Sequence, residues 1–254
     1  MITGKSKCIT PHIHNITHKL SHTSIHYFIM NKELTEIAYI LDRSSSMHLL
    51  VESAITGFNT FLKDQQETPG EANLTLVLFD NEYSLHADCS PITEVRPLDA
   101  STYVPRGCTA LLDAIGRTID NIGKKLAETP EKDRPGKVIV AIYTDGYENA
   151  STDYDTRKIS KMIRHQTDNY DWEFLFLAAN EDAIATAASY GIDSKNASQV
   201  QFSEIGNFSS AGSISRKVSS HRKIMQQCAS PAEQLDLKAA LSHIVKEEEE
   251  KLYK

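Results

Sequence analysis

The chain lacks long apolar runs. Nowhere do its 254 residues approach the roughly 20 consecutive apolar residues of a membrane-spanning helix. The best apolar run near the N-terminus covers only residues 27–30, which is too short for the centre of a secretory signal peptide. We therefore expect a cytoplasmic protein with no membrane partner.

The sequence also has no paired cysteine motif and no excess of positive charge. Its four cysteines, Cys8, Cys89, Cys108 and Cys228, lie far apart and form no CxxC pair. This spacing predicts free thiols and argues against a disulfide framework or a zinc site. The formal net charge of −7 argues against a general nucleic-acid binder.

One segment, residues 216–223, is locally basic and contains Arg216, Lys217, His221, Arg222 and Lys223. We expect these side chains to form a solvated helix face. A local nucleic-acid patch is the alternative.

Apolar patterning predicts strands that alternate with helices. Continuous apolar runs, typical of strands buried on both faces, end at Asp42 and at Thr144. The expected strands are 37–41, 74–79, 83–90, 138–143, 172–178 and 199–202, and the expected helices are 47–66, 109–127, 156–167, 182–190 and one after Gly206. The second and third strands are joined by a short turn, which predicts an antiparallel edge hairpin. The fold class is therefore α/β, a doubly wound, mostly parallel, Rossmann-like open sheet with one antiparallel edge strand.

The C-terminal part is expected to be helical. Residues 231–252 show apolar side chains at helical spacing, with Ser230 and Pro231 as a suitable start. We predict a single helix there, so the domain covers residues 33–228 and a C-terminal helix covers residues 229–254.

Residues 1–32 are rich in His, Thr, Ser and Lys. We expect a disordered extension, with Met30 as a candidate natural start. His14, His18, His22 and His26 recur every four residues, which leaves a metal-binding helix face as the alternative.

Oxygen-bearing side chains cluster where expected elements end or begin. Asp42, Ser44 and Ser46 follow the first strand, Thr109 opens the second helix, and Asp145 follows the fourth strand. Because the carboxyl ends of parallel strands meet at one sheet edge, these residues lie together if the first and fourth strands are neighbours. Two carboxylates and three hydroxyls are hard ligands, which predicts Mg²⁺, or Mn²⁺ in its place, and not zinc or copper.

Each residue also has an ordinary structural alternative. Asp42 and Ser44 are common helix caps, and Thr109 is a common N-cap. The Asp145-Gly146 pair is a common turn. These alternatives would have to hold together to remove the metal site, so we favour the site.

The order Asp42-x-Ser44-x-Ser46, then Thr109, then Asp145, on this strand pattern, resembles the metal-ion-dependent adhesion site (MIDAS) of a von Willebrand factor type A (vWA) domain. The resemblance covers roughly residues 34–205. Segments 40–44, 143–149 and 172–180 are similar to bacterial and phage-borne cytoplasmic members. The family usually has glycine at the position of Ser45. If that position requires a positive φ, the serine is strained by about 1–2 kcal/mol.

The resemblance implies a division of roles among the five residues. Ser44 and Ser46 would bind Mg²⁺ directly, Thr109 would join them in the ligand-competent state, and Asp42 and Asp145 would act directly or through water. One coordination position would stay open for a Glu or Asp of a partner protein. Neutral direct ligands leave the metal electrophilic, which favours a strong hold on that carboxylate. Candidate rim residues are Arg43, His48, Arg106, Tyr147 and Glu148.

We therefore predict a non-enzymatic, Mg²⁺-dependent protein-interaction module with no catalytic residue. One alternative is an Mg²⁺-dependent phosphoryl-transfer enzyme. However, the haloacid-dehalogenase pattern needs an aspartate where this chain has Ser44, and the sequence has no GxxxxGK[ST] loop. The other alternative is a scaffold that docks an assembly through its C-terminal helix, with a vestigial metal site.

Overall fold

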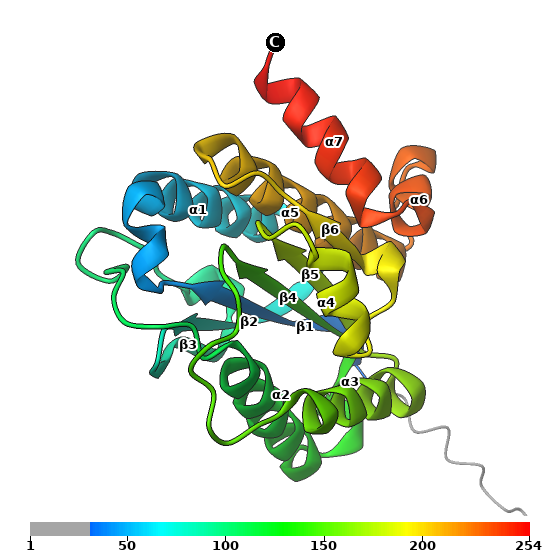
Figure 1. The fold of residues 1–254 in the computed structure, drawn as a ribbon. Coiled ribbons are helices and arrows are strands. Elements are labelled where there is room, and N and C mark those ends of the chain that lie inside the picture. Colours follow the sequence, from blue (N-terminus) through cyan, green and yellow to red (C-terminus); the bar gives the residue numbers. More distant parts are fainter. Residues whose placement is uncertain (1–30) are drawn as a thin grey trace, which may run out of the picture.

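Six strands form one open sheet with helices on both faces (Figure 1). The computed structural model describes residues 31–254. The strands are β1 (Asn31–Asp42), β2 (Glu71–Phe79), β3 (Tyr83–Pro91), β4 (Pro135–Thr144), β5 (Glu173–Ala178) and β6 (Ala197–Gln199). Their spatial order is β3-β2-β1-β4-β5-β6, and only the β2–β3 pair is antiparallel. The predicted α/β sheet with one antiparallel edge is therefore confirmed.

The helices divide between the two faces of the sheet (Figure 1). One face packs against α1 (Val51–Glu67), α5 (Glu204–Met225) and α7 (Leu241–Leu252), with α6 (Pro231–Lys238) beside α5. The other face packs against α2 (Leu111–Glu128), α3 (Thr156–Tyr170) and α4 (Ala183–Ser189). Short 3₁₀ helices occur at η1 (Ser45–Leu50), η2 (Ile92–Glu94), η3 (Glu131–Asp133) and η4 (Ser194–Asn196).

Strand β1 lies in the middle of the sheet and is buried on both sides. Tyr39 belongs to the core of one face, where its ring centroid lies 5.4 Å from that of Phe58 and 4.9 Å from that of Phe61. Ile40 belongs to the core of the other face, together with Ile115 of α2. A central parallel strand needs apolar residues on both faces, which explains the continuous apolar run. Its last residue is thereby placed at the middle of the sheet edge.

The strand predicted at residues 199–202 is wrong in its bounds, because β6 covers Ala197–Gln199. Ala197 and Ser198 are buried, whereas Phe202 is exposed. Ser203 then starts α5, since its hydroxyl accepts a hydrogen bond of 3.1 Å from Gly206 N.

The single C-terminal helix predicted at residues 231–252 is also wrong, because the chain forms two helices, α6 and α7. Ala239 and Ala240, between them, are extended. The buried Lys217 ammonium of α5 donates to Leu237 O at 3.1 Å and to Ala239 O at 2.8 Å. These carbonyls therefore serve a buried cation from another helix, and the α-helix is interrupted there.

The expected solvated face at residues 216–223 is wrong for two of its members, because Lys217 is 1% exposed and Arg222 is 2% exposed. The Arg222 guanidinium donates to the carbonyls of Gln65 at 2.5 Å, Thr68 at 3.0 Å and Gly70 at 2.7 Å, around the C-terminus of α1. The last carbonyls of a helix have no intrahelical donors, and here the buried Arg222 donates hydrogen bonds to carbonyls at that end of α1.

The disordered extension expected over residues 1–32 does not include Asn31 and Lys32, which belong to β1, and residues 1–30 lie outside the part of the chain that the structure describes. The histidine series at His14, His18, His22 and His26 lies outside residues 31–254, as do Met30 and Cys8. Of the other cysteines, Cys89, Cys108 and Cys228 are free thiols. None of the helices between residues 31 and 254 has the length and apolar character to cross a membrane.

Glu36 is a buried carboxyl within the sheet. It lies on β1 and is 2% exposed. Thr75 Oγ1, on the neighbouring β2, donates a hydrogen bond of 2.9 Å to Glu36 Oε1. Burial raises the pKa of Glu36 to about 7 from an ordinary value of 4.5.

We predict that Glu36→Gln removes part of the pH dependence of stability. Because the folded pKa lies above the unfolded value, the Glu36 contribution is fully present below about pH 4.5 and is lost as the pH rises through about 7. This pKa shift corresponds to a change of about 3 kcal/mol in the free energy of unfolding. Urea unfolding should show the glutamine variant more stable than wild type at about pH 8, with that advantage lost at about pH 5. An identical difference at both pH values would refute this.

Candidate metal centre

Asp42, the last residue of β1, is the most deeply buried member of the predicted site. Its Oδ1 accepts a hydrogen bond of 2.6 Å from Ser44 N, and its Oδ2 accepts one of 2.6 Å from Thr144 Oγ1. Its carbonyl accepts a bond of 2.5 Å from the buried Tyr103 hydroxyl. Asp42 therefore connects β1 to the loop that follows it, to β4 and to the segment before α2.

The two serine hydroxyls of the predicted site lie side by side. Ser44 Oγ and Ser46 Oγ are 3.0 Å apart. Ser44 stands at the N-cap position of η1, but its side chain makes no capping hydrogen bond. The capping alternative is therefore not realised for Ser44. Ser45 is exposed and does not have a positive φ, so serine carries no left-handed strain at this position.

Thr109 is buried and approaches the same place from the other side. Its N–H donates to Asn149 Oδ1 at 2.9 Å, and its carbonyl accepts from Asn149 N at 3.0 Å. Ala110, and not Thr109, is the N-cap residue of α2, which begins at Leu111. A methyl group placed on Gly146 would lie 3.5 Å from Thr109 Oγ1 and 3.9 Å from Ser46 Oγ. The Thr109 and Ser46 hydroxyls therefore both approach the residue next to Asp145.

Asp145 is half-buried, but its two carboxylate oxygens are shielded from solvent. Within residues 31–254, neither of these oxygens has a hydrogen-bond partner by geometry. Burial raises the pKa of Asp145, and the nearby Ser46 hydroxyl opposes that rise. Burial, and then the negative charge of Asp145, raise the pKa of Asp42 as well. Two buried carboxylates that repel each other are costly unless a cation lies near them.

The donor set fits a hard divalent cation. One edge of the sheet carries two carboxylates and three hydroxyls, and one of the carboxylates has no hydrogen-bond partner among the described residues. Such oxygen donors suit Mg²⁺ or Mn²⁺. Within residues 31–254, no group of three or more His, Cys, Asp and Glu side chains is arranged to hold a metal. Any metal at this edge would therefore depend on hydroxyl ligands, and the ligand role of the five residues stays a prediction.

The expected rim residues differ in their exposure to solvent. Arg43 is buried against Asp80, and Glu148 accepts a hydrogen bond of 2.9 Å from Leu112 N at the start of α2. Arg43 therefore does not form part of an exposed rim, and Glu148 is only half-buried. The exposed ones are His48, Arg106 and Tyr147.

Sequence reasoning missed the residues that hold the site together. Thr144 bonds to Asp42, Tyr103 bonds to the Asp42 carbonyl, and Asn149 holds Thr109. Thr144 has a usable signal, because it directly precedes Asp145 at a strand end. Tyr103 and Asn149 lie in irregular segments, where no periodic pattern indicates a role.

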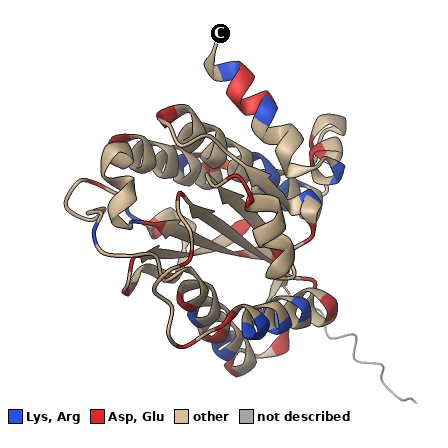
Figure 2. Cartoon of the chain, viewed as in Figure 1, with Lys and Arg blue, Asp and Glu red and all other residues tan. Residues whose placement is uncertain are grey.

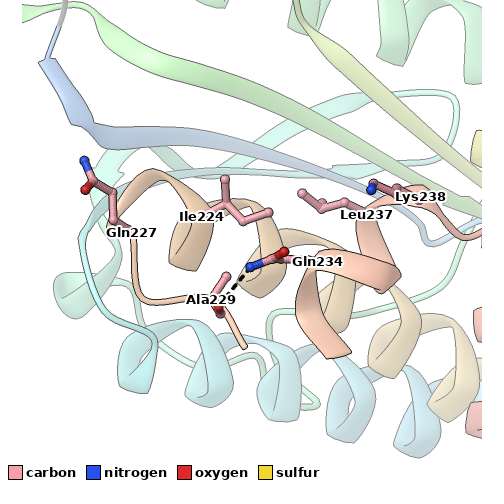
Figure 3. Close-up of a pocket in the computed structure, with 6 residues that line it drawn as sticks. All are labelled: Ile224, Gln227, Ala229, Gln234, Leu237 and Lys238. Carbon is pink, nitrogen blue, oxygen red and sulfur yellow. Dashed lines mark hydrogen bonds between the residues drawn. The ribbon is translucent and has the colours of Figure 1, made fainter. Parts of the chain in front are cut away.

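Two features outside the site are the distribution of charge and a pocket beside α6. Figure 2 shows that charged residues lie mainly on helices and loops, while the strands are largely free of them. Figure 3 shows a pocket of about 370 Å³ between the end of α5 and α6. It lies at the opposite end of β1 from Asp42, because Gln226, just beyond α5, donates to Glu33 O at 3.4 Å. Its lining residues are Ile224, Gln227, Ala229, Gln234, Leu237 and Lys238.

No protein-family model and no curated protein sequence matches the chain. Among solved structures, proximal thread matrix protein 1 from the mussel byssus matches with a TM-score of 0.50 and 16% identity, over 76% of this chain and 46% of that chain. A mutant of the PilB minor pilin from Streptococcus sanguinis matches with a TM-score of 0.50 and 11% identity, over 80% and 65%. A von Willebrand factor type A protein from Catenulispora acidiphila matches with a TM-score of 0.45 and 11% identity, over 77% and 42%.

The chain has the fold of a vWA domain, with the DxSxS segment at the end of its central strand. At these identities the likeness concerns the fold alone. The chain spans less than half of the mussel protein and about two thirds of the pilin.

We predict that Asp145→Asn stabilises the metal-free protein and removes its stabilisation by Mg²⁺. The substitution relieves the repulsion of Asp42 by Asp145 but removes a predicted metal ligand. In thermal denaturation with EDTA, the variant should melt above wild type, by about 2–4 °C for each kcal/mol relieved. With Mg²⁺ at about 100 times its dissociation constant, wild type should gain about 2.7 kcal/mol of stability and Asp145→Asn should gain none. Ser45→Ala is the matched control and should behave as wild type; equal Mg²⁺ gains in all three proteins would overturn the site.

Proposed function

We propose that this chain is a non-enzymatic, Mg²⁺-dependent protein-interaction module whose metal binds a carboxylate of a partner protein. The observation that carries the proposal is the Asp145 carboxylate, which is buried without a hydrogen-bond partner among the described residues and lies beside the Ser46 and Thr109 hydroxyls. A cation with an open position would complete this group and attract a partner Glu or Asp.

Ser44, Ser46 and Thr109 would hold the metal directly, and Asp42 and Asp145 would hold it directly or through water. The bound ion would supply a positive charge that grips an anionic oxygen. Asp42 keeps the Ser44 backbone in place by accepting its N–H, and Thr144 orients the Asp42 carboxylate. Mn²⁺ is the natural substitute for Mg²⁺ with such ligands.

The ionisable groups around the site support binding more than catalysis. Asp80 is shared by Arg43 and Arg106, at 3.0 and 2.9 Å. Glu148 accepts hydrogen bonds from the backbone N–H groups of Leu112 and Ser151. Because these carboxylates are already engaged in structural bonds, they are poorly suited to act as general bases for phosphoryl transfer.

Packing of the C-terminal helices argues against a scaffold that docks through them. Leu241, Ile244 and Val245 of α7 are buried within the described domain. Their apolar side chains are therefore not available to a partner unless α7 detaches. The free thiols of Cys89, Cys108 and Cys228 support our further proposal that the module works in the cytoplasm, as in the bacterial and phage-borne proteins that its sequence resembles.

We predict that Thr109→Ala abolishes partner capture without unfolding the domain. Thr109 contributes a hydroxyl, whereas the Asp42 side chain accepts two structural hydrogen bonds, so Asp42→Ala is a poorer probe. The full chain is immobilised and exposed to lysate of its host in Mg²⁺ and in EDTA, with Thr109→Ala in parallel. A partner should be retained only by wild type in Mg²⁺.

Ser45→Ala controls for disturbance of the exposed loop and should retain the partner. Retention by Thr109→Ala, or by wild type in EDTA, would contradict a metal bridge. Thermal melting of each variant in EDTA checks that the domain is folded.

A further inference from the structure

Thr109 stands at the end of a long irregular connection. Residues 95–110, between η2 and α2, contain no helix or strand. The position of the Thr109 hydroxyl therefore depends on individual bonds between this segment and its neighbours. Leu98 is held by Asn59, with bonds of 2.8 and 2.9 Å, and Tyr103 is held by the Asp42 carbonyl.

The last anchor before Thr109 is a buried carboxylate, Asp80, in the turn between β2 and β3. Its Oδ2 accepts a hydrogen bond of 2.9 Å from Arg106 Nε. The same oxygen forms an ion pair with Arg43, whose Nε lies 3.0 Å away but makes no hydrogen bond to any described residue. Asp80 is fully buried. Its carbonyl accepts a hydrogen bond of 2.9 Å from Ala110 N. Asp80 thus contacts the DxSxS loop at Arg43 and the Thr109 segment on both sides of Thr109.

Backbone hydrogen bonds also join residues 95–110 to the DxSxS loop. Arg106 N donates to Arg43 O at 2.9 Å, and Ser45 N donates to Gly107 O at 3.2 Å. Gly107 has a φ of +64°, and a Cβ on it would lie 1.8 Å from Asn81 Oδ1. The positive φ favours glycine at this position, and a larger residue would have to displace the exposed Asn81 side chain.

We infer that Asp80 is a positioning residue that, through Arg43 and Arg106, sets the distance of Thr109 from Ser44 and Ser46 and so sets the metal affinity of the site. The inference rests on the proposed metal site. Its physical basis is that one buried carboxylate contacts both arginines, so the two loops that carry the hydroxyls share this anchor in addition to the backbone hydrogen bonds between them. Groups that orient metal ligands in this way commonly change metal affinity by about 10–100-fold when removed.

The test is Mn²⁺ binding to the full chain, followed by the electron paramagnetic resonance of free Mn²⁺. Arg106→Gln removes the bond from Arg106 to Asp80 and also the exposed ion pair of Arg106 with Glu82. Because the Arg106 side chain is 51% exposed, the change leaves the buried Arg43–Asp80 pair in place. The set comprises wild type, Thr109→Ala, Arg106→Gln and the double variant. Arg117→Gln is the matched control, since Arg117 forms a comparable exposed pair with Asp153 at 2.7 Å.

Thr109→Ala should weaken Mn²⁺ binding by about tenfold or more, and Arg106→Gln should weaken it by about tenfold. In the Arg106→Gln background, removal of Thr109 should cost less than about twofold further, because the hydroxyl has already left its place. Arg117→Gln should stay within about twofold of wild type. Asp80→Asn should repeat the Arg106→Gln result, with melting temperature as the check on folding.

A merely structural role would give a different pattern, in which Thr109→Ala costs the same factor in both backgrounds. That result, or unchanged binding in Arg106→Gln, would overturn the positioning role alone. Wild-type protein that shows no saturable Mn²⁺ binding would overturn the proposed metal site together with this inference.

Discussion

The burial of the Asp42 carboxylate at the middle of the sheet edge is the constraint on which the rest of the site depends. β1 is the central strand and is packed on both faces, so its last residue has little access to water. The charge is tolerated because Ser44 N and Thr144 Oγ1 donate to it. Those same bonds hold the serine loop and align the end of β4, which carries Asp145.

The groups that would bind a ligand at this site lower the stability of the fold when no ligand is bound. Burial raises the pKa of both carboxyls, and the charge of Asp145 raises the pKa of Asp42 further, so this pair would not be chosen for a stable core. Such local conflicts are typical of binding sites, because the missing compensation is supplied by the ligand. The apolar faces of β1 and β4 supply the stability that allows this conflict to persist at the edge.

The fold and the proximity of the site residues could both be predicted from the sequence, because both follow from the way parallel strands pack in a sheet. Buried parallel strands require apolar runs, and the carboxyl ends of adjacent strands meet, so Asp42 and Asp145 could be placed together from pattern alone. The break between α6 and α7 and the burial of Arg222 were not predictable. They depend on Lys217 and Arg222 binding carbonyls of distant segments, and such long-range contacts have no local signature. The anchoring of Thr109 through Asp80 is of the same kind.

The most direct test of the metal site is the anomalous diffraction of crystals of the full chain grown with Mn²⁺. The account predicts one dominant peak at this sheet edge, about 2.0–2.2 Å from the oxygens of its direct ligands, with Ser44 and Ser46 among them. Strong Mn²⁺ peaks only elsewhere, with Asp145 hydrogen-bonded to protein groups, would contradict it. The buried carboxylate pair would then be a purely structural feature of the sheet edge.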